Sequence, residues 1–198
     1  KNLILLGNRS TNLVIGTLYD RAYTFLDLKY PGKGGYVVRS LHNPFGNGRN
    51  VLFVGGSDWE GVKAATASLI ELLRSAGGQP GKLSVNYLAK VKLGTGYVLP
   101  DKIEDTQIWE ASEYYKSSGY FGWNIISKNM ALFYMTGEER FLREFLRLSF
   151  PDSSAIKELE VKDGERIEDK KHPLSGPYHY SAHMMIEMWD LIEESPLL

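Results

Sequence analysis

The chain has 198 residues, of which 43% are hydrophobic and 12% aromatic, enough apolar surface for one large or two small folded domains. Its 23 basic and 24 acidic residues are intermixed and leave a formal net charge of -1, which disfavours nucleic acid and anionic membrane surfaces as partners. The absence of cysteine excludes a disulfide framework and thiolate chemistry. No apolar run approaches the roughly 20 residues that span a bilayer, so we expect a soluble globular protein.

The first predicted elements are a strand and a helix. Residues 2–7 (NLILLG) form a short apolar run that is closed by glycine. Residues 8–12 then offer several helix caps, and the apolar positions Leu13, Ile15 and Leu18 follow them. This order predicts a strand, a turn and a helix.

A hairpin and a second helix come next. Residues 34–41 and 50–56 are rich in β-branched and aromatic residues, and the loop between them contains Pro and Gly, so we expect an antiparallel pair. We also expect residues 2–7 to lie parallel beside 50–56, because both runs lead into helices that can cover the sheet. The second helix is predicted from the apolar positions Val62, Ala65, Leu69 and Leu72, with a stop at residues 76–81.

The turn at residues 55–58 (GGSD) admits two interpretations. Glycines and free backbone N–H groups at a helix start are typical of an anion site. However, no phosphate-binding motif is present, and Asp58 with Glu60 would oppose a phosphate. We therefore predict an architectural turn that binds no nucleotide, in which Ser57 or Asp58 caps the helix and Gly61 allows close packing on the sheet.

The character of the chain changes near residue 100. Residues 1–100 predict a β-α-β-β-α domain with a mixed sheet, and residues 101–198 predict an all-helical segment, so the fold class is α+β. Asp163-Gly164 suits the tight turn of a surface hairpin or mobile loop. Helical patterns in the second half cover about 103–118, 123–135, 138–150 and 180–194, the last with Met184, Met188, Leu191 and Ile192 on its apolar side.

The first half resembles a known accessory domain. The segments GYVVRSL and NVLFVGGSDWEGVKAATASLIELL, with LILLGNRSTNLVI before them, are similar to the small α/β domain that precedes the catalytic part of β-hexosaminidases and α-glucuronidases. The resemblance covers about half of the chain and consists of fold signatures. It implies an accessory domain that does no chemistry.

The second half resembles the start of an (α/α) toroid, as in polysaccharide lyases and some glycoside hydrolases. The similarity lies in residues 120–148, where an aromatic Gly-Trp loop opens a helix and a Thr-Gly-Glu-Glu link joins it to the next one. A full toroid needs more helices than this chain holds. The resemblance therefore implies a piece of a longer enzyme whose active site is incomplete here.

The segment GPYHYSAHMM contains the candidate catalytic residues Tyr178, His179, Tyr180 and His183. In toroid lyases a Tyr commonly moves the proton, and a His or Asn neutralises the uronate carboxylate. The carry-over to these residues is by residue type and not by register. The alternative is that the aromatic rings pack a helix start and that each His is only hydrogen-bonded.

The spacing of His179 and His183 can hold zinc on one helical face, but no third ligand is evident, so we predict no metal and no cofactor. Tyr120, Trp123 and Asn124 are candidates for substrate binding, because flat aromatic rings stack on sugar faces; the alternative for the aromatic residues is core packing. A glycosidase acid/base pair would have to come from the carboxylates Glu110, Glu113, Glu138, Glu139, Glu193 and Glu194, most of which we expect on solvated helix faces.

These patterns together predict an N-terminal fragment of a secreted or periplasmic bacterial enzyme that degrades a polysaccharide. A lyase is preferred to a glycoside hydrolase, because Tyr and His cluster while no carboxylate pair stands out. The predicted partners are a polysaccharide or oligosaccharide and the rest of the same polypeptide, with no nucleic acid and no membrane. The alternative is a non-catalytic carbohydrate-binding or scaffolding module.

Overall fold

The structure, a computed structural model, divides into two compact units. The sheet unit contains residues 1–98 together with two short later segments, 135–137 and 190–198. The helical unit contains residues 99–134 and 138–189. The structure describes residues 2–76, 85, 87–97, 125–149, 189 and 192–198.

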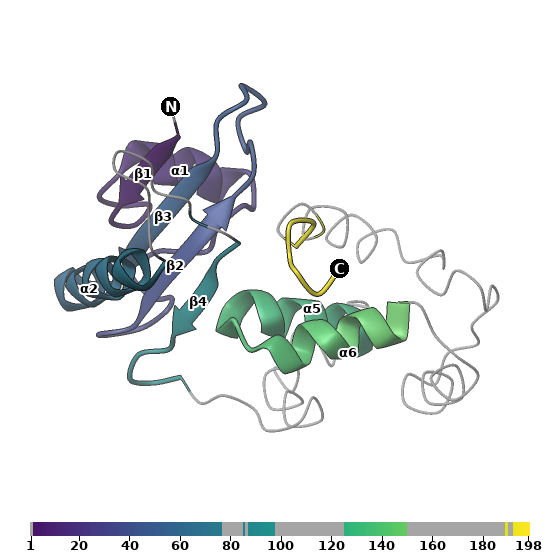
Figure 1. Cartoon of the computed structure of the whole chain (residues 1–198). Helices are drawn as coiled ribbons and strands as arrows, with labels where there is room; N and C mark the ends of the chain where they lie inside the picture. The colour runs from purple at the N-terminus through teal and green to yellow at the C-terminus, as the bar shows by residue number, and fades with distance from the viewer. Residues whose placement is uncertain (1, 77–84, 86, 98–124, 150–188, 190–191) are drawn as a thin grey trace. The chain divides into compact units, whose positions relative to one another are not determined.

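The sheet unit is built on a mixed four-stranded sheet with the order β1-β3-β2-β4 (Figure 1). β1 pairs parallel with β3, and β2 pairs antiparallel with both β3 and β4. The α+β class, the parallel neighbours and the hairpin predicted from the sequence are thereby confirmed. The strands are β1 (Leu3–Leu6), β2 (Tyr36–Leu41), β3 (Val51–Gly56) and β4 (Ala89–Lys92).

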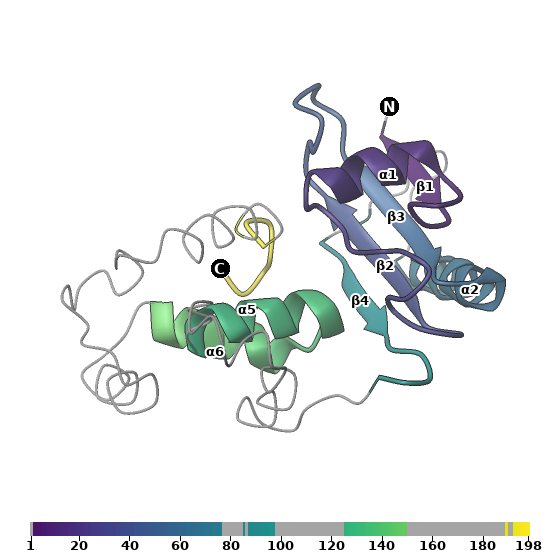
Figure 2. The same cartoon turned by 180° about the vertical axis from the view of Figure 1, so that it is seen from behind.

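Helices α1 (Leu13–Asp20) and α2 (Trp59–Ser75) cover opposite faces of this sheet, as the front and back views show (Figure 2). On the α2 side, the buried cluster consists of Val38, Leu52, Val54, Ala65 and Leu69. By register, Leu5 and Phe53 lie on the α1 side, and both are buried. Each face of the sheet therefore has its own apolar layer.

Helix α1 begins in the predicted capping segment. The side chain of Asn12 accepts hydrogen bonds from the backbone N–H groups of Val14 and Ile15. Ile15 and Leu18 are buried, whereas Leu13 is 90% exposed. At about 100° per residue, Leu13 lies about 140° or more around the helix from both of these residues, so it cannot share their face.

Strand β4 lies between the predicted stop of the second helix at residues 76–81 and the change of character near residue 100, where no element was predicted. It pairs with β2 at the edge of the sheet, with Val37 opposite Val91 and Val38 opposite Lys90. Its two lysines are exposed. A four-residue strand with alternating lysines carries little apolar signal, and it forms because β2 offers an open edge for pairing.

Two helices are described after residue 124. They are α5 (Ile125–Thr136) and α6 (Glu139–Ser149), which match the predicted patterns 123–135 and 138–150. Gly137 between them has a φ of +69°, a left-handed conformation that favours glycine. The patterns at 103–118 and most of 180–194 lie outside the described residues, as does the Asp163-Gly164 turn; Trp189 is helical and residues 192–194 form a turn.

Candidate functional site

One end of the sheet brings three loops together. Because β1 and β3 are parallel and β2 is antiparallel to β3, the chain leaves β1 and β3 and enters β2 at the same end. The helices that follow β1 and β3 lie on opposite faces of the sheet. Adjacent strands whose helices diverge in this way form the usual place for a ligand in open α/β sheets. We therefore take this end, with residues 7–12, 31–35 and 55–61, as the candidate site.

The backbone of the β3–α2 turn is packed against its neighbours without room for side chains. A Cβ atom on Gly56 would lie 2.6 Å from the backbone carbon of Gly61. A Cβ atom on Gly61 would overlap the carbonyl oxygen of Gly35, and one on Gly55 would overlap that of Gly7. The glycines therefore serve the close approach of the three loops, as the architectural interpretation of this turn predicted.

Side chains of the turn then tie the loops together. One carboxylate oxygen of Asp58 accepts a hydrogen bond from the N–H of Gly61 at 2.8 Å, which caps α2. The other accepts one from the N–H of Gly34 at 3.0 Å. The hydroxyl of Ser57 accepts a further hydrogen bond from the N–H of Gly32 at 3.0 Å. Of the two caps that the sequence allows, Ser57 and Asp58, the structure assigns the role to Asp58.

The electrostatics of Asp58 follow from these bonds. Its pKa is lowered chiefly by the N–H of Gly61, then by that of Gly34, and further by the nearby ammonium of Lys33, while partial burial acts in the opposite direction. A carboxylate of the protein itself thus holds a position at the start of α2 where an anion would bind. This geometry supports an architectural turn, and the absence of nucleotide binding stays a prediction.

The β1–α1 loop is attached to the same turn by Asn8. This side chain is 3% exposed, and its amide nitrogen donates to the carbonyl oxygen of Gly56 at 3.0 Å. Its amide oxygen accepts from the N–H of Ser10 at 3.0 Å. Asn8, Ser57 and Asp58 are therefore all engaged in holding backbone groups at this end of the sheet.

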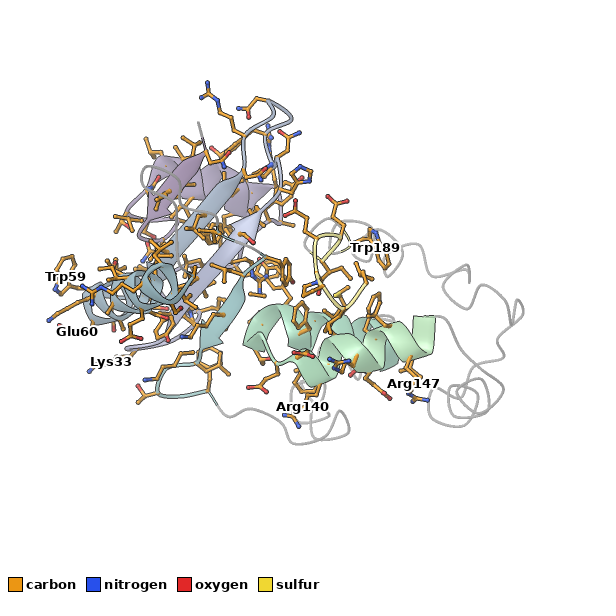
Figure 3. The ribbon with its side chains drawn as sticks, in the orientation of Figure 1. Lys33, Trp59, Glu60, Arg140, Arg147 and Trp189 are labelled. Atoms are coloured by element: carbon orange, nitrogen blue, oxygen red, sulfur yellow. The ribbon has the colours of Figure 1, made fainter. Side chains whose placement is uncertain are left out.

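Beside the turn lie exposed side chains, unlike those of Asn8 and Ser57, which are buried and bound to backbone groups. Trp59, the first residue of α2, is 74% exposed, and Glu60 and Lys33 are also exposed. In Figure 3 the ring of Trp59 points away from the ribbon at the start of the helix. The sequence did not single out Trp59, because it lies about 120° around the helix from the apolar position Ala65 but only about 80° from Leu69, so its exposure cannot be read from helical phase.

In the helical unit, charged side chains pair along the surface of α6. Arg143 binds Glu139, and the guanidinium of Arg147 lies 2.7 Å from a carboxylate oxygen of Glu144. On the same helix the guanidinium of Arg140 lies 4.5 Å from the ring centroid of Phe141, and Figure 3 labels Arg140 and Arg147. The Glu139 carboxylate, one of the proposed glycosidase candidates, is therefore held in an exposed ion pair.

Two other candidate carboxylates lie in the sheet unit. The Nδ1 atom of His42 is 3.3 Å from a carboxylate oxygen of Glu193 and 3.5 Å from one of Glu194. All three side chains are nearly half exposed. These two glutamates meet a histidine at the surface, and Glu138 is exposed as well. Their exposure agrees with the prediction, but Glu193 and Glu194 lie in a turn and Glu138 directly precedes α6, so these three are not on helix faces.

The residues predicted to act on substrate lie outside the described part of the chain. They are the catalytic candidates Tyr178, His179, Tyr180 and His183 and the substrate-binding candidates Tyr120, Trp123 and Asn124, together with the carboxylates Glu110 and Glu113. Their convergence on one surface therefore stays a prediction. Among the residues that are described, no group of three or more His, Asp or Glu side chains is arranged to hold a metal ion.

Comparison with known proteins gives no match: neither a family model, nor a curated protein, nor a solved structure is similar to this chain. The resemblance of the first half to accessory α/β domains and of the second half to an (α/α) toroid therefore stays a prediction. Within the described ranges, none of the helices is both long enough and apolar enough to cross a membrane.

Proposed function

We propose that this chain is part of a polysaccharide-degrading protein in which the sheet unit is an accessory module without catalytic residues. The observation that carries the proposal is that the polar side chains at the end of the sheet are hydrogen-bonded to the protein's own backbone. Both carboxylate oxygens of Asp58, the hydroxyl of Ser57 and the amide of Asn8 are bound to backbone groups. A side chain fixed in this way serves the architecture and is poorly placed to transfer a proton.

The chemistry is assigned to the second half of the chain. In the proposed lyase reaction, Tyr178 or Tyr180 moves the proton, and His179 or His183 neutralises the uronate carboxylate beside the acidic carbon. The substrate is then an acidic polysaccharide, no cofactor is needed, and the protein is a secreted or periplasmic bacterial one. The lyase is favoured over the hydrolase because Tyr and His cluster at residues 178–183, whereas the described candidate Glu139 is held by an arginine and the candidates Glu193 and Glu194 lie beside a histidine at the surface.

The test uses the polypeptide that contains this chain and an acidic polysaccharide such as polygalacturonate. His179→Ala and Tyr180→Phe should each lower turnover about 100-fold or more, the scale expected when a general acid or base is lost. His42→Ala is the matched control, because this histidine lies in the sheet unit, and it should keep the wild-type rate. Ultraviolet absorbance of an unsaturated product marks a lyase, and new reducing ends without that absorbance mark a hydrolase. Wild-type turnover in both variants would contradict the assignment.

A non-catalytic carbohydrate-binding or scaffolding module is the second candidate. It is favoured by the exposed tryptophan at the start of α2, which has no evident role in folding. If the polypeptide retains glycans but releases no product from any polysaccharide, this second function replaces the first.

A further inference from the structure

The loop between β2 and β3, residues 42–50, contains the dipeptide Asn47-Gly48. Both residues are exposed, and the loop lies at the end of the sheet opposite to the candidate site (Figure 1). An asparagine that precedes a glycine readily loses its side-chain amide, since glycine has no side chain to shield its backbone nitrogen. No other asparagine in the sequence precedes a glycine. Asn47 is therefore the residue at which this reaction is expected first.

Loss of the Asn47 amide needs water and no other reactant. The backbone nitrogen of Gly48 gives up its proton and attacks the side-chain carbonyl carbon Cγ of Asn47. The bond between Cγ and the amide nitrogen breaks, and ammonia leaves with that proton, so that a succinimide ring remains. Water then opens the ring at either of its carbonyl groups. The product is an aspartate or an isoaspartate, and the isoaspartate has a longer main chain.

Two hydrogen bonds in the loop act on these groups in opposite directions. The side-chain oxygen of Asn47 accepts a hydrogen bond from the N–H of Arg49 at 3.1 Å. This bond closes a turn around the Gly48 peptide and draws electrons from Cγ, which favours the attack. The N–H of Gly48, however, donates to the side-chain oxygen of Asn43 at 2.6 Å. Because an acceptor bound to this N–H opposes loss of its proton, the bond to Asn43 slows the attack.

The rest of the loop holds Asn43 in this position. Its φ of +40° is one that asparagine adopts more readily than most residues. Its N–H donates to the side-chain oxygen of Asn50 at 3.1 Å, and its carbonyl oxygen accepts from the N–H of Gly46 at 2.9 Å. The N–H of Asn50 donates in turn to the side-chain oxygen of Asn2 at 3.0 Å. We propose that Asn47 is a site of spontaneous deamidation and that the side chain of Asn43 sets its rate.

Incubation of the full chain in mildly alkaline buffer, followed by peptide mass spectrometry and an enzymatic isoaspartate assay, tests this inference. In the wild type, Asn47 should convert faster than Asn50, which precedes a β-branched residue of β3. Asn43→Gly suits the positive φ but removes the acceptor, so Asn47 should convert about fivefold faster, the factor that corresponds to one ordinary hydrogen bond. Asn43→Asp keeps an acceptor oxygen and should restore the slow rate. In urea, where the loop is unfolded, the wild type and Asn43→Gly should convert equally.

The matched control is Asn2→Ala, which removes the acceptor of the Asn50 N–H in the same loop and leaves the bond between Gly48 and Asn43. This variant should convert at the wild-type rate. Equal rates for wild type and Asn43→Gly, no rescue in Asn43→Asp, an equal acceleration in Asn2→Ala, or conversion of Asn50 as fast as that of Asn47 would each overturn the inference. None of these rates depends on a substrate, so the result is independent of the proposed function.

Discussion

The two strand-to-helix turns of the sheet unit both combine glycine with a polar helix cap, but their side chains form hydrogen bonds over different distances along the chain. Each strand ends in or is followed by glycine, and each helix begins with a polar cap, Asn12 before α1 and Asp58 before α2. Among the residues that the structure describes, the side chain of Asn12 binds groups no more than six residues away from it. Asp58 also binds Gly34, 24 residues away, and the neighbouring Ser57 binds Gly32, 25 residues away. The second cap therefore organises a distant loop as well as its own helix.

The glycines inside the two helices show the same contrast. Gly61 of α2 faces the backbone of Gly35, and a side chain there has no space. Within the described part of the chain, Gly16 of α1 has the carbonyl oxygen of Arg9 as its neighbour, and a methyl carbon on Gly16 would lie 3.6 Å from that oxygen, an ordinary contact distance. One glycine is required by packing, whereas the other is only tolerated.

The largest effect should come from Gly61→Ala. The new methyl group would overlap a backbone carbonyl oxygen that belongs to a tied loop, so the helix must move away from the sheet. We expect the free energy of unfolding to fall by about 3 kcal/mol, the upper part of the usual range for overpacking. Urea denaturation monitored by tryptophan fluorescence measures this. A loss as small as that of an ordinary surface substitution would show that α2 is not pressed against the loop.

The second largest effect should come from removing the helix caps, which should lower the free energy of unfolding by different amounts at the two turns. Asn12→Ala loses local bonds and should destabilise the protein by about 1 kcal/mol, the typical value for a helix cap. Asp58→Ala also leaves the N–H of Gly34 without its acceptor, so we expect about 2 kcal/mol. The two variants are compared by denaturation in the same buffer. Equal losses would mean that the long-range bond contributes nothing.

Acid should erase the difference between wild type and Asp58→Asn. The folded-state pKa of Asp58 lies below its unfolded value, mainly because the N–H of Gly61 binds the charged form. Its stabilisation is therefore complete above about pH 4 and is lost as the pH falls through the folded-state pKa. Denaturation of both proteins from about pH 6 to about pH 2 should show the gap closing toward the acid end. A gap that stays constant with pH would exclude the carboxylate as its source.

The smallest effect, of opposite sign, is expected for Gly16→Ala. The site is helical, has room for a methyl group and lies outside any tight packing. Alanine reduces the freedom of the unfolded chain and should stabilise the protein by about 0.5 kcal/mol. The midpoint of thermal unfolding should rise slightly. A fall would show that α1 packs more closely around Gly16 than the structure indicates.

Much of the sheet unit was predictable from local patterns. The apolar runs of β1 and β3 and the polar caps after them predicted two strands, two helices and their pairing. Strand β4 was not predicted, since a lysine-rich edge strand depends on its neighbour.

The candidate site was predictable only in part. The sequence shows Asp58 as a cap, but not its second bond, because Gly34 approaches it only after the hairpin has formed. Likewise, nothing in the spacing of Lys33 and Trp59 indicates that one end of the sheet holds both. The tyrosines and histidines at 178–183 lie outside the described residues. Their proposed role therefore rests on residue type alone.

The sheet unit is discontinuous along the chain, and this has a consequence for its synthesis. Residues 190–198 belong to it, and Glu193 and Glu194 are the partners of His42 at the end of β2. A ribosome adds about 5–20 residues per second, so β4 is made about 5–20 s before these glutamates exist. During that interval the four strands can pair, while His42 has neither carboxylate beside it. A nascent chain arrested before residue 190 would therefore carry all four strands of the sheet but not the two partners of His42.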